Sequence, residues 1–256
     1  MQTNIPKTSE ALSALMRADF TTQWRNRKSF MLILLVPVVI LVSWQGIINK
    51  IGAAFAFSTC ITIGLMAIGL MGYSNSIARD REKGVFQRLR VSPVPSWTIM
   101  VSRLSVQLAM ILLLTILVFI AGFYVDHVSI TPAGYALAFL AAIAGGAVYL
   151  GLGQVIVGLI KNPETVNSTT RLVYFLFIMV GMFSDFSALD EQASGTVKLV
   201  NNIVKWSPYG CVKRILLASM EPGTWNMDCT NALLLTFGYA VLLSAIGIRK
   251  FKWSTK

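Results

Sequence analysis

Long stretches without a charged residue constrain this 256-residue chain more than any other feature of its sequence. Five such runs hold 21, 28, 22, 34 and 20 residues, and they lie at 29–49, 51–78, 104–125, 127–160 and 229–248. Because a helix needs about 20 mainly apolar residues to cross the hydrocarbon core of a bilayer, each run can supply one spanning helix. The sequence therefore predicts an integral membrane protein with an all-α fold.

The composition excludes the main alternatives to a membrane protein. Only 13% of the residues are charged and 55% are hydrophobic, whereas a soluble globular protein carries about 25% charged residues. So few charges cannot cover the surface of a soluble enzyme, and so many apolar residues do not stay disordered. Three cysteines are too few for a secreted disulfide-rich scaffold.

A sixth span is predicted from a helix-start motif. The uncharged run 172–184 holds only 13 residues, but Asn162, Pro163 and Glu164 are typical of the cap and first turn of a helix, so the run can begin earlier. Six spans are expected in all, within residues 30–256: Phe30–Ile48, Ala53–Ile77, Leu104–Val125, Tyr135–Ile160, Thr165–Ser184 and Asn231–Ile248.

The distribution of basic residues predicts the orientation. With the N-terminus inside, 17 of the 22 Lys and Arg residues lie on the cytosolic side and 5 lie outside. Since cytosolic loops carry the excess of Lys and Arg, both termini are expected in the cytoplasm. The first 29 residues are polar and mixed in charge, so no cleavable signal peptide is expected.

Residues 1–29 are predicted to contain a helix over Ser9–Lys28. Apolar side chains recur at every fourth position, and Asp19 and Gln23 interrupt the face that they form. One interpretation is a helix in the cytosolic membrane interface with its apolar face toward lipid. The other is a soluble helix packed on the protein's own loops. The recurring residues are Leu12, Met16, Phe20 and Trp24.

The cytosolic loop 79–103 is predicted to begin with a short helix that Pro93 and Pro95 end. Val85, Phe86 and Leu89 form a small apolar ridge among basic neighbours. A solvated loop has no reason to expose such side chains, so the ridge indicates a docking surface for another protein. The alternative is a solvated loop whose charge only sets the orientation.

The outer segment 185–230 carries two amphipathic stretches separated by Ser207 and Pro208, and we expect two short helices at the outer leaflet. Cys211 and Cys229 both lie on this side. They are either joined by a disulfide, which an extracytoplasmic compartment permits, or are two buried free thiols.

The fourth span carries three pairs of small residues that predict close helix packing within the chain: Ala141/Gly145, Ala142/Gly146 and Ala147/Gly151.

Motifs for catalysis or cofactor binding are missing from the sequence. It has no G-x-x-x-x-G-K-[ST] loop to hold ATP phosphates, no G-x-S-x-G motif and no Cys/His cluster around its one histidine, His127. We therefore expect no enzyme activity, no cofactor, no metal and no nucleic-acid binding in this chain.

Among polar residues of the spans, Gln45, Gln107 and Gln154 either make interhelical hydrogen bonds or line a transport path.

Two segments resemble a known family of membrane proteins. The sequence ARDREKGVFQRLRVSPVPSW at 78–97 resembles the charged, Glu-containing segment of the membrane subunit of type-2 ATP-binding-cassette (ABC) exporters, and Trp206-Ser207-Pro208-Tyr209 is similar to a Pro-containing element before the last span of that family. Six spans in about 250 residues with both ends in the cytosol agree with the resemblance, which covers essentially the whole chain.

The resemblance implies a mechanism and partners. Such subunits work in pairs of like or different chains, each pair with two cytosolic ABC ATPases that bind ATP and Mg, and the loop after the second span forms a coupling helix that docks on the ATPase. A second, smaller contact is implied at Lys161–Glu164. The residues thereby implied in ATPase coupling are Glu82, Lys83, Val85, Phe86, Leu89, Asn162, Pro163 and Glu164.

The expected function is ATP-driven export across a plasma or inner membrane, in a bacterium or an archaeon. The spans are mostly apolar, so a path between two subunits suits a hydrophobic or amphipathic cargo such as a drug, an antibiotic, a peptide or a lipid-linked glycan. The alternative function is an ion-coupled secondary transporter. Against that alternative, every Asp and Glu lies outside the apolar runs, where no carboxylate can couple to an ion within the bilayer.

Overall fold

The computed structural model describes residues 8–25, 27–90, 96–126, 130–187 and 194–250, and within these ranges it contains helices and turns but no strand. The all-α prediction is therefore confirmed for the described chain. The elements are α1 (Thr8–Arg25), α2 (Arg27–Ser43), α3 (Ile48–Ile51), α4 (Ala53–Met66), the π-helix η1 (Ala67–Tyr73), α5 (Ser74–Glu82), α6 (Val85–Arg90), α7 (Ser96–Asp126), α8 (Pro132–Leu159), α9 (Pro163–Ser187), α10 (Gly195–Trp206), α11 (Pro208–Met220), the 3₁₀ turn η2 (Pro222–Thr224) and α12 (Met227–Lys250).

Five helical stretches of the described chain are long and apolar enough to cross a membrane, which supports a multi-pass membrane protein. They match the second to sixth predicted spans: Ala53–Glu82, Thr98–Val125, Pro132–Leu159, Pro163–Ser187 and Met227–Lys250. The first predicted span, Phe30–Ile48, is represented by α2, whose apolar part Met31–Ser43 is shorter than a crossing requires. The count of six is thus not confirmed.

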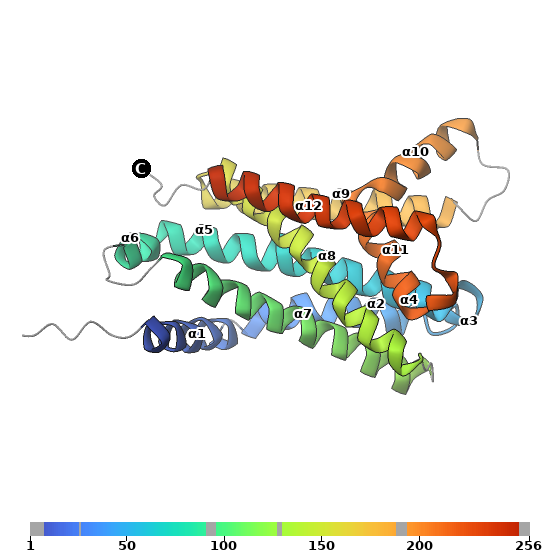
Figure 1. Cartoon of the computed structure of the whole chain (residues 1–256), viewed down its shortest axis with the longest axis horizontal. Coiled ribbons are helices and arrows are strands. Elements are labelled where there is room, and N and C mark those ends of the chain that lie inside the picture. The colour runs from blue at the N-terminus through green and yellow to red at the C-terminus, as the bar shows by residue number, and fades with distance from the viewer. Residues whose placement is uncertain (1–7, 26, 91–95, 127–129, 188–193, 251–256) are drawn as a thin grey trace, which may run out of the picture.

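The long helices alternate in direction, so that the short elements collect at the two ends of the bundle (Figure 1). One end carries α6, the start of α7 and the last turn of α12, and α1 lies along this end. The other end carries α3, α10 and α11. The expected pair of short helices is present, because α10 and α11 are separated at Ser207, whose hydroxyl accepts a hydrogen bond from the backbone N–H of Gly210 at 3.3 Å. Their place at the outer leaflet stays a prediction.

The helix α4 lies at the centre of the bundle, and every residue from Ala56 to Met66 is buried. It packs against α2, α7, α8 and α11, and it continues through η1 into α5. The π-helical η1 shifts the hydrogen-bond ladder by one residue, and the hydroxyl of Ser74 donates to the carbonyl of Gly69 at 3.1 Å. A π segment in a long helix often marks a functional region.

Small residues of α8 pack within the chain, as predicted. A Cβ added at Gly153 would lie 2.4 Å from the carbonyl oxygen of Gly69, so α8 and η1 meet backbone to backbone. Gly145 faces the side chain of Val212 in α11, and Gly146 faces the side chain of Ile111 in α7. The approach at Gly153 needs glycine because backbone already fills the space of a methyl group.

The helix α1 confirms the predicted N-terminal helix and packs mainly along α7. Leu12, Leu15 and Met16 are partly buried, whereas Phe20 and Trp24 are exposed. The helix therefore packs on the protein with one part of its apolar face and leaves another part uncovered. Its contact with lipid stays a prediction.

Replacing Gly153 with alanine tests the backbone contact between α8 and η1. The added methyl group meets a backbone atom that cannot rotate away, so we expect a loss of about 1–3 kcal/mol in the free energy of unfolding. The matched control is Gly238→Ala in α12, where a Cβ meets nothing within 4 Å and stability should stay equal or rise. Unfolding in detergent measures both variants, and equal stability of the two would contradict the contact.

Candidate functional site

The α6 end of the bundle holds the residues that the sequence assigned to coupling. α5 ends at Glu82, and Gly84 adopts a φ of +68°, which is the left-handed conformation that glycine favours after a helix. The N–H of Gly84 donates to the carbonyl of Arg81 at 3.1 Å, and the carbonyl of Gly84 accepts from the N–H of Arg88 at 3.2 Å. This glycine turn ends α5 and begins α6 without a longer loop.

The prediction of an exposed apolar ridge is wrong for Phe86. Its side chain is only 2% exposed and belongs to the buried core, while Val85 is partly buried. The aromatic ring anchors α6 to the bundle, because burying it removes a large apolar surface from water. The exposed side chains here are those of Glu82, Lys83, Gln87 and Arg88. The side chain of Leu89, together with Pro93, Pro95 and His127, lies outside the described residues.

Arg81 joins the two predicted coupling segments. Its side chain is almost completely buried, with 1% exposed. One guanidinium nitrogen, Nη1, donates to the carbonyl of Val157 at 2.8 Å, and the other, Nη2, donates to the carbonyls of Ile160 and Lys161 at 2.7 and 3.0 Å. These carbonyls lie at the C-terminal end of α8 and just beyond it, where a helix leaves acceptors unpaired and its dipole favours a positive charge.

The connection from α8 to α9 confirms the predicted helix start. The side-chain oxygen of Asn162 accepts a hydrogen bond from the N–H of Glu164 at 2.9 Å, and Pro163 is the first residue of α9. The side chains of Asn162 and Glu164 are exposed beside the segment that Arg81 holds. The structure therefore brings the end of α5 and the start of α9 together through Arg81.

A second charged cluster joins α5 to α7 and α1. Nη2 of Arg103 lies 2.6 Å from Oδ2 of Asp80, and Nε lies 3.4 Å from Oδ1 of Asp19. The hydroxyl of Ser102 donates to Asp19 at 2.5 Å. Burial raises the pKa of the Asp19 carboxyl, while the hydrogen bond from Ser102 and the charge of Arg103 lower it. Asp19 interrupts the apolar face of α1 because it faces this cluster.

Asp19, Asp80, Arg81 and Arg103 were not singled out from the sequence as site residues. Two signals pointed toward them: a carboxylate within the apolar face of the N-terminal helix, and the run Arg-Asp-Arg-Glu at the end of a span. Neither signal identifies the partner, since the partners lie in distant segments of the chain.

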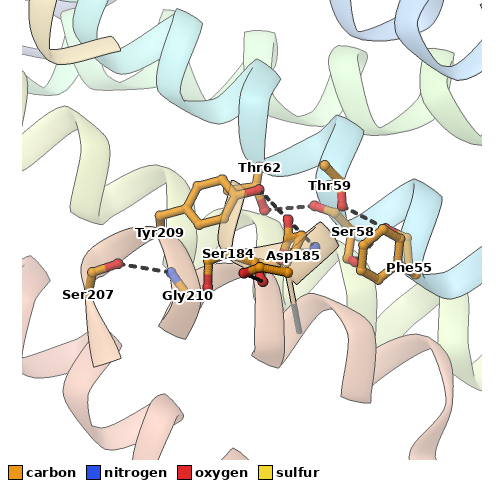
Figure 2. A network of polar contacts seen from close by, with 11 residues as sticks. Phe55, Ser58, Thr59, Thr62, Ser184, Asp185, Ser207, Tyr209 and Gly210 are labelled. Carbon is orange, nitrogen blue, oxygen red and sulfur yellow. Dashed lines mark hydrogen bonds and ion pairs between the residues drawn. The ribbon is translucent and has the colours of Figure 1, made fainter. Parts of the chain in front are cut away.

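At the opposite end of the bundle, Asp185 of α9 is held by α11. The hydroxyl of Tyr209 donates to Oδ2 of Asp185 at 2.9 Å (Figure 2), and Nζ of Lys213 lies 2.6 Å from the same oxygen. Lys213 also lies over the ring of Phe55, 3.6 Å from its centroid. Burial lowers the pKa of Lys213, and the neighbouring Asp185 raises it. This cluster pins α11 to α9 and to the start of α4.

The polar residues proposed for a transport path are not brought together. Gln45 is exposed and donates to the carbonyl of Val125 at 3.2 Å, and Gln107 is buried in α7. Gln154 accepts a hydrogen bond from the hydroxyl of Tyr73 at 2.6 Å and lines a mainly apolar cavity of about 350 Å³ between η1, α7, α8 and α12. Gln154 and Tyr73 thus make an interhelical hydrogen bond at the edge of a cavity.

The structure shows the second alternative for Cys211 and Cys229, which are both buried free thiols. The sulfur of Cys211 lies 3.4 Å from the carbonyl oxygen of Trp206, so it points to the end of α10. Burial raises the pKa of Cys211 to about 11, which keeps this thiol protonated at neutral pH.

Among the described residues, no three His, Cys, Asp or Glu side chains are grouped to hold a metal.

Comparison with known proteins gives two findings. The sequence model of a family described as "ABC-2 family transporter protein" matches residues 37–249. The chain is also similar to "Putative transport permease YvfS" of Bacillus subtilis (strain 168), with 19% identity over 198 residues that cover 75% of this chain and 78% of that protein. The region matched by the family includes α6, Arg81 and the connection from α8 to α9.

Replacing Arg81 with methionine tests the link between α5 and α8. Three backbone carbonyls lose their donor, and an unsatisfied buried acceptor costs about 1–3 kcal/mol. We expect the amides of residues 157–162 to exchange with deuterium about tenfold faster, since local opening becomes easier. Arg88→Met, which removes an exposed arginine of α6, is the control and should leave these amides unchanged. Equal exchange in both variants would show that Arg81 does not hold this segment.

Proposed function

Because this chain belongs to the ABC-2 family of transporter proteins, we propose that it is the membrane-spanning permease subunit of an ATP-driven exporter and works with separate cytosolic ATPase subunits. The observation that carries the proposal is the position of Arg81, which joins the end of α5 to the connection between α8 and α9. Both segments lie at the α6 end of the bundle, where a bound partner can displace them together. Family membership favours this function over an ion-coupled secondary transporter.

The partner ATPase supplies the energy in this proposal. The chain has no phosphate-binding loop of the G-x-x-x-x-G-K-[ST] type, so ATP and Mg bind to the ATPase. The docking surface consists of the exposed side chains around the glycine turn and at the start of α9. They are Glu82, Lys83, Arg88, Asn162 and Glu164, with Val85 at their edge.

Recognition at this surface is mainly electrostatic. Since Phe86 is buried, the partner contacts a charged turn rather than an apolar knob. Complementary charges raise the rate of association and set the register of the two proteins. The role of Phe86 is then to hold α6 in position, and Leu89 and Pro163 stay in the proposed contact as the continuation of α6 and the first residue of α9.

Movement of α6 can reach the whole bundle through rigid elements. α5 continues into η1 and the buried α4, Arg81 holds the end of α8, and Arg103 connects Asp80 with α1 and α7. A displacement that ATP binding imposes on α6 therefore acts on the central helix and on α8, α7 and α1 at once. Such coupling through packed helices with two arrangements is a known route for transmitting a conformational change.

The cargo is a hydrophobic or amphipathic compound in this proposal, and the transport path forms between this subunit and a second copy or a related chain. Apolar side chains remain uncovered along α7, α9 and α12, and in the cavity beside Gln154 the polar pair Tyr73–Gln154 faces apolar walls. A mainly apolar cavity with few polar groups is typical of sites for amphipathic small molecules.

Reversing the charge of the docking surface tests the proposal. In Lys83→Glu/Arg88→Glu, two positive charges of the turn become negative, and we expect at least a tenfold loss of affinity for the ATPase, which equals about 1.4 kcal/mol. The control is Lys50→Glu, an exposed charge in α3 at the other end of the bundle. The assay measures the ABC ATPase that co-purifies with each variant from the native cells.

Two results would contradict the proposed function. One is that no ABC ATPase co-purifies with the wild-type chain, and the other is that the double variant retains as much ATPase as Lys50→Glu. Helical content and elution volume in detergent should be the same for all three proteins, which separates a lost contact from a lost fold.

A further inference from the structure

A polar cavity of about 350 Å³ lies between α1, α2, η1, α5 and α9, and α5 is the helix that leads to α6. Its polar lining includes Asn75 and Arg79 from α5, and Glu164, Asn167 and Arg171 from α9. Asn75 and Arg79 are four residues apart, and Glu164, Asn167 and Arg171 follow at spacings of three and four. Each set therefore lies on one helix face, and the two faces form opposite walls.

Neither arginine of this cavity forms an ion pair within the described part of the chain, where Arg79 and Arg171 have no carboxylate oxygen within 4 Å. Arg79 donates a hydrogen bond to the carbonyl of Asn75, at 3.3 Å on its own helix. With Glu164 as the one acidic residue of the lining, the cavity carries a net charge of +1.

Arg171 is exposed and lies in the first part of a helix that is long and apolar enough to span a membrane. It lies eight residues after the first residue of α9, or about 12 Å along the helix axis, and the apolar part of that helix follows at once. A charged side chain within a spanning helix is expensive unless it reaches water or meets an opposite charge. An anion in the cavity supplies that opposite charge at the membrane boundary.

The cavity also has an unused hydrogen-bond acceptor. The amide nitrogen of Asn75 donates to the side-chain oxygen of Asn167 at 3.3 Å, which joins α5 to α9. The side-chain oxygen of Asn75 is buried and has no hydrogen-bond donor among the residues that the structure describes. A ligand that carries a hydroxyl group as well as an anionic group matches this arrangement, because the hydroxyl can donate to Asn75.

Beyond Arg171, α9 offers an apolar surface. Leu172, Phe175, Leu176 and Met179 are 69, 60, 59 and 68% exposed, so the described part of the chain leaves them uncovered. An anionic group at the arginines followed by an apolar strip along the same helix matches one kind of molecule, a phospholipid with its phosphate at the cavity and its acyl chains along the helix. Basic pockets between helices at the membrane boundary bind such headgroups.

We propose that this cavity binds the phosphate of an anionic phospholipid with a hydroxylated headgroup, such as phosphatidylglycerol. Arg79 and Arg171 bind the phosphate, and Asn75 accepts a hydrogen bond from the headgroup hydroxyl. Bound there, the lipid contacts α5 and α9 next to the segment that Arg81 holds. The site does not depend on the proposed export function.

Native mass spectrometry of the full chain in a neutral detergent tests the site. The protein is titrated with phosphatidylglycerol, with phosphatidylcholine of the same acyl chains, and with inorganic phosphate alone. We expect the affinity for the first bound molecule of phosphatidylglycerol to be at least tenfold higher than the affinity for the first bound molecule of phosphatidylcholine. Inorganic phosphate should give no stable complex. In Arg79→Gln/Arg171→Gln the preference should fall to about twofold or less.

The control variant is Arg249→Gln/Lys250→Gln, which removes two exposed charges from the last turn of α12 at the same end of the bundle. It should keep the preference, since these charges do not line the cavity. Equal loss in both double variants would show a general attraction to basic residues and would overturn the site. A stable complex with inorganic phosphate, together with no preference among the lipids, would show that the cavity binds free phosphate and would overturn the proposal of a phospholipid. If the arginine double variant does not fold, Arg171→Gln alone must still lower the preference at least threefold.

Discussion

The guanidinium of Arg81 is buried in a largely apolar bundle, and three backbone carbonyls at the end of α8 accept its hydrogen bonds. A buried charge without partners would be expensive, and helix-end carbonyls without donors would be as well, so the two Nη atoms of Arg81 and the three carbonyls stabilise one another. These hydrogen bonds join three segments into one unit: the end of α5, the glycine turn with α6, and the connection to α9. The docking surface that we propose for an ATPase lies on this unit.

The rest of the bundle extends this unit toward the other end. The helix from Ala53 to Glu82 passes through the centre of the protein, and its π segment touches α8 backbone to backbone at Gly69 and Gly153. Contacts of this kind leave little room for independent movement, because packed interiors resist small displacements. At the far end, Asp185, Tyr209 and Lys213 connect α9 with α11. A permease needs such continuity if an event on one face is to change access on the other.

Much of the fold could be predicted from the sequence because the bilayer and local backbone chemistry impose it. Four of the five long uncharged runs correspond to long helices, Asn162 and Pro163 predicted the start of the fifth long helix, α9, and Ser207 with Pro208 predicted the break between α10 and α11. The contacts between distant segments could not be predicted. Periodicity shows that Phe86 and Leu89 are apolar but not whether they face a partner or the core, and the burial of Phe86 decided against the partner. Likewise, no local pattern shows that Arg81 reaches α8 or that Asp19 faces Arg103.

Docking of a cytosolic ATPase requires that α6 and the start of α9 face the cytosol, and impermeant thiol labelling of intact cells tests this orientation most directly. One variant carries Arg88→Cys in α6, and the other carries Ser194→Cys before α10; both positions are exposed, whereas Cys211 and Cys229 are buried. We expect that Ser194→Cys is labelled from outside and that Arg88→Cys is labelled only after the membrane is opened. Labelling of Arg88→Cys in intact cells would place α6 on the outer side, and no cytosolic ATPase could then reach it.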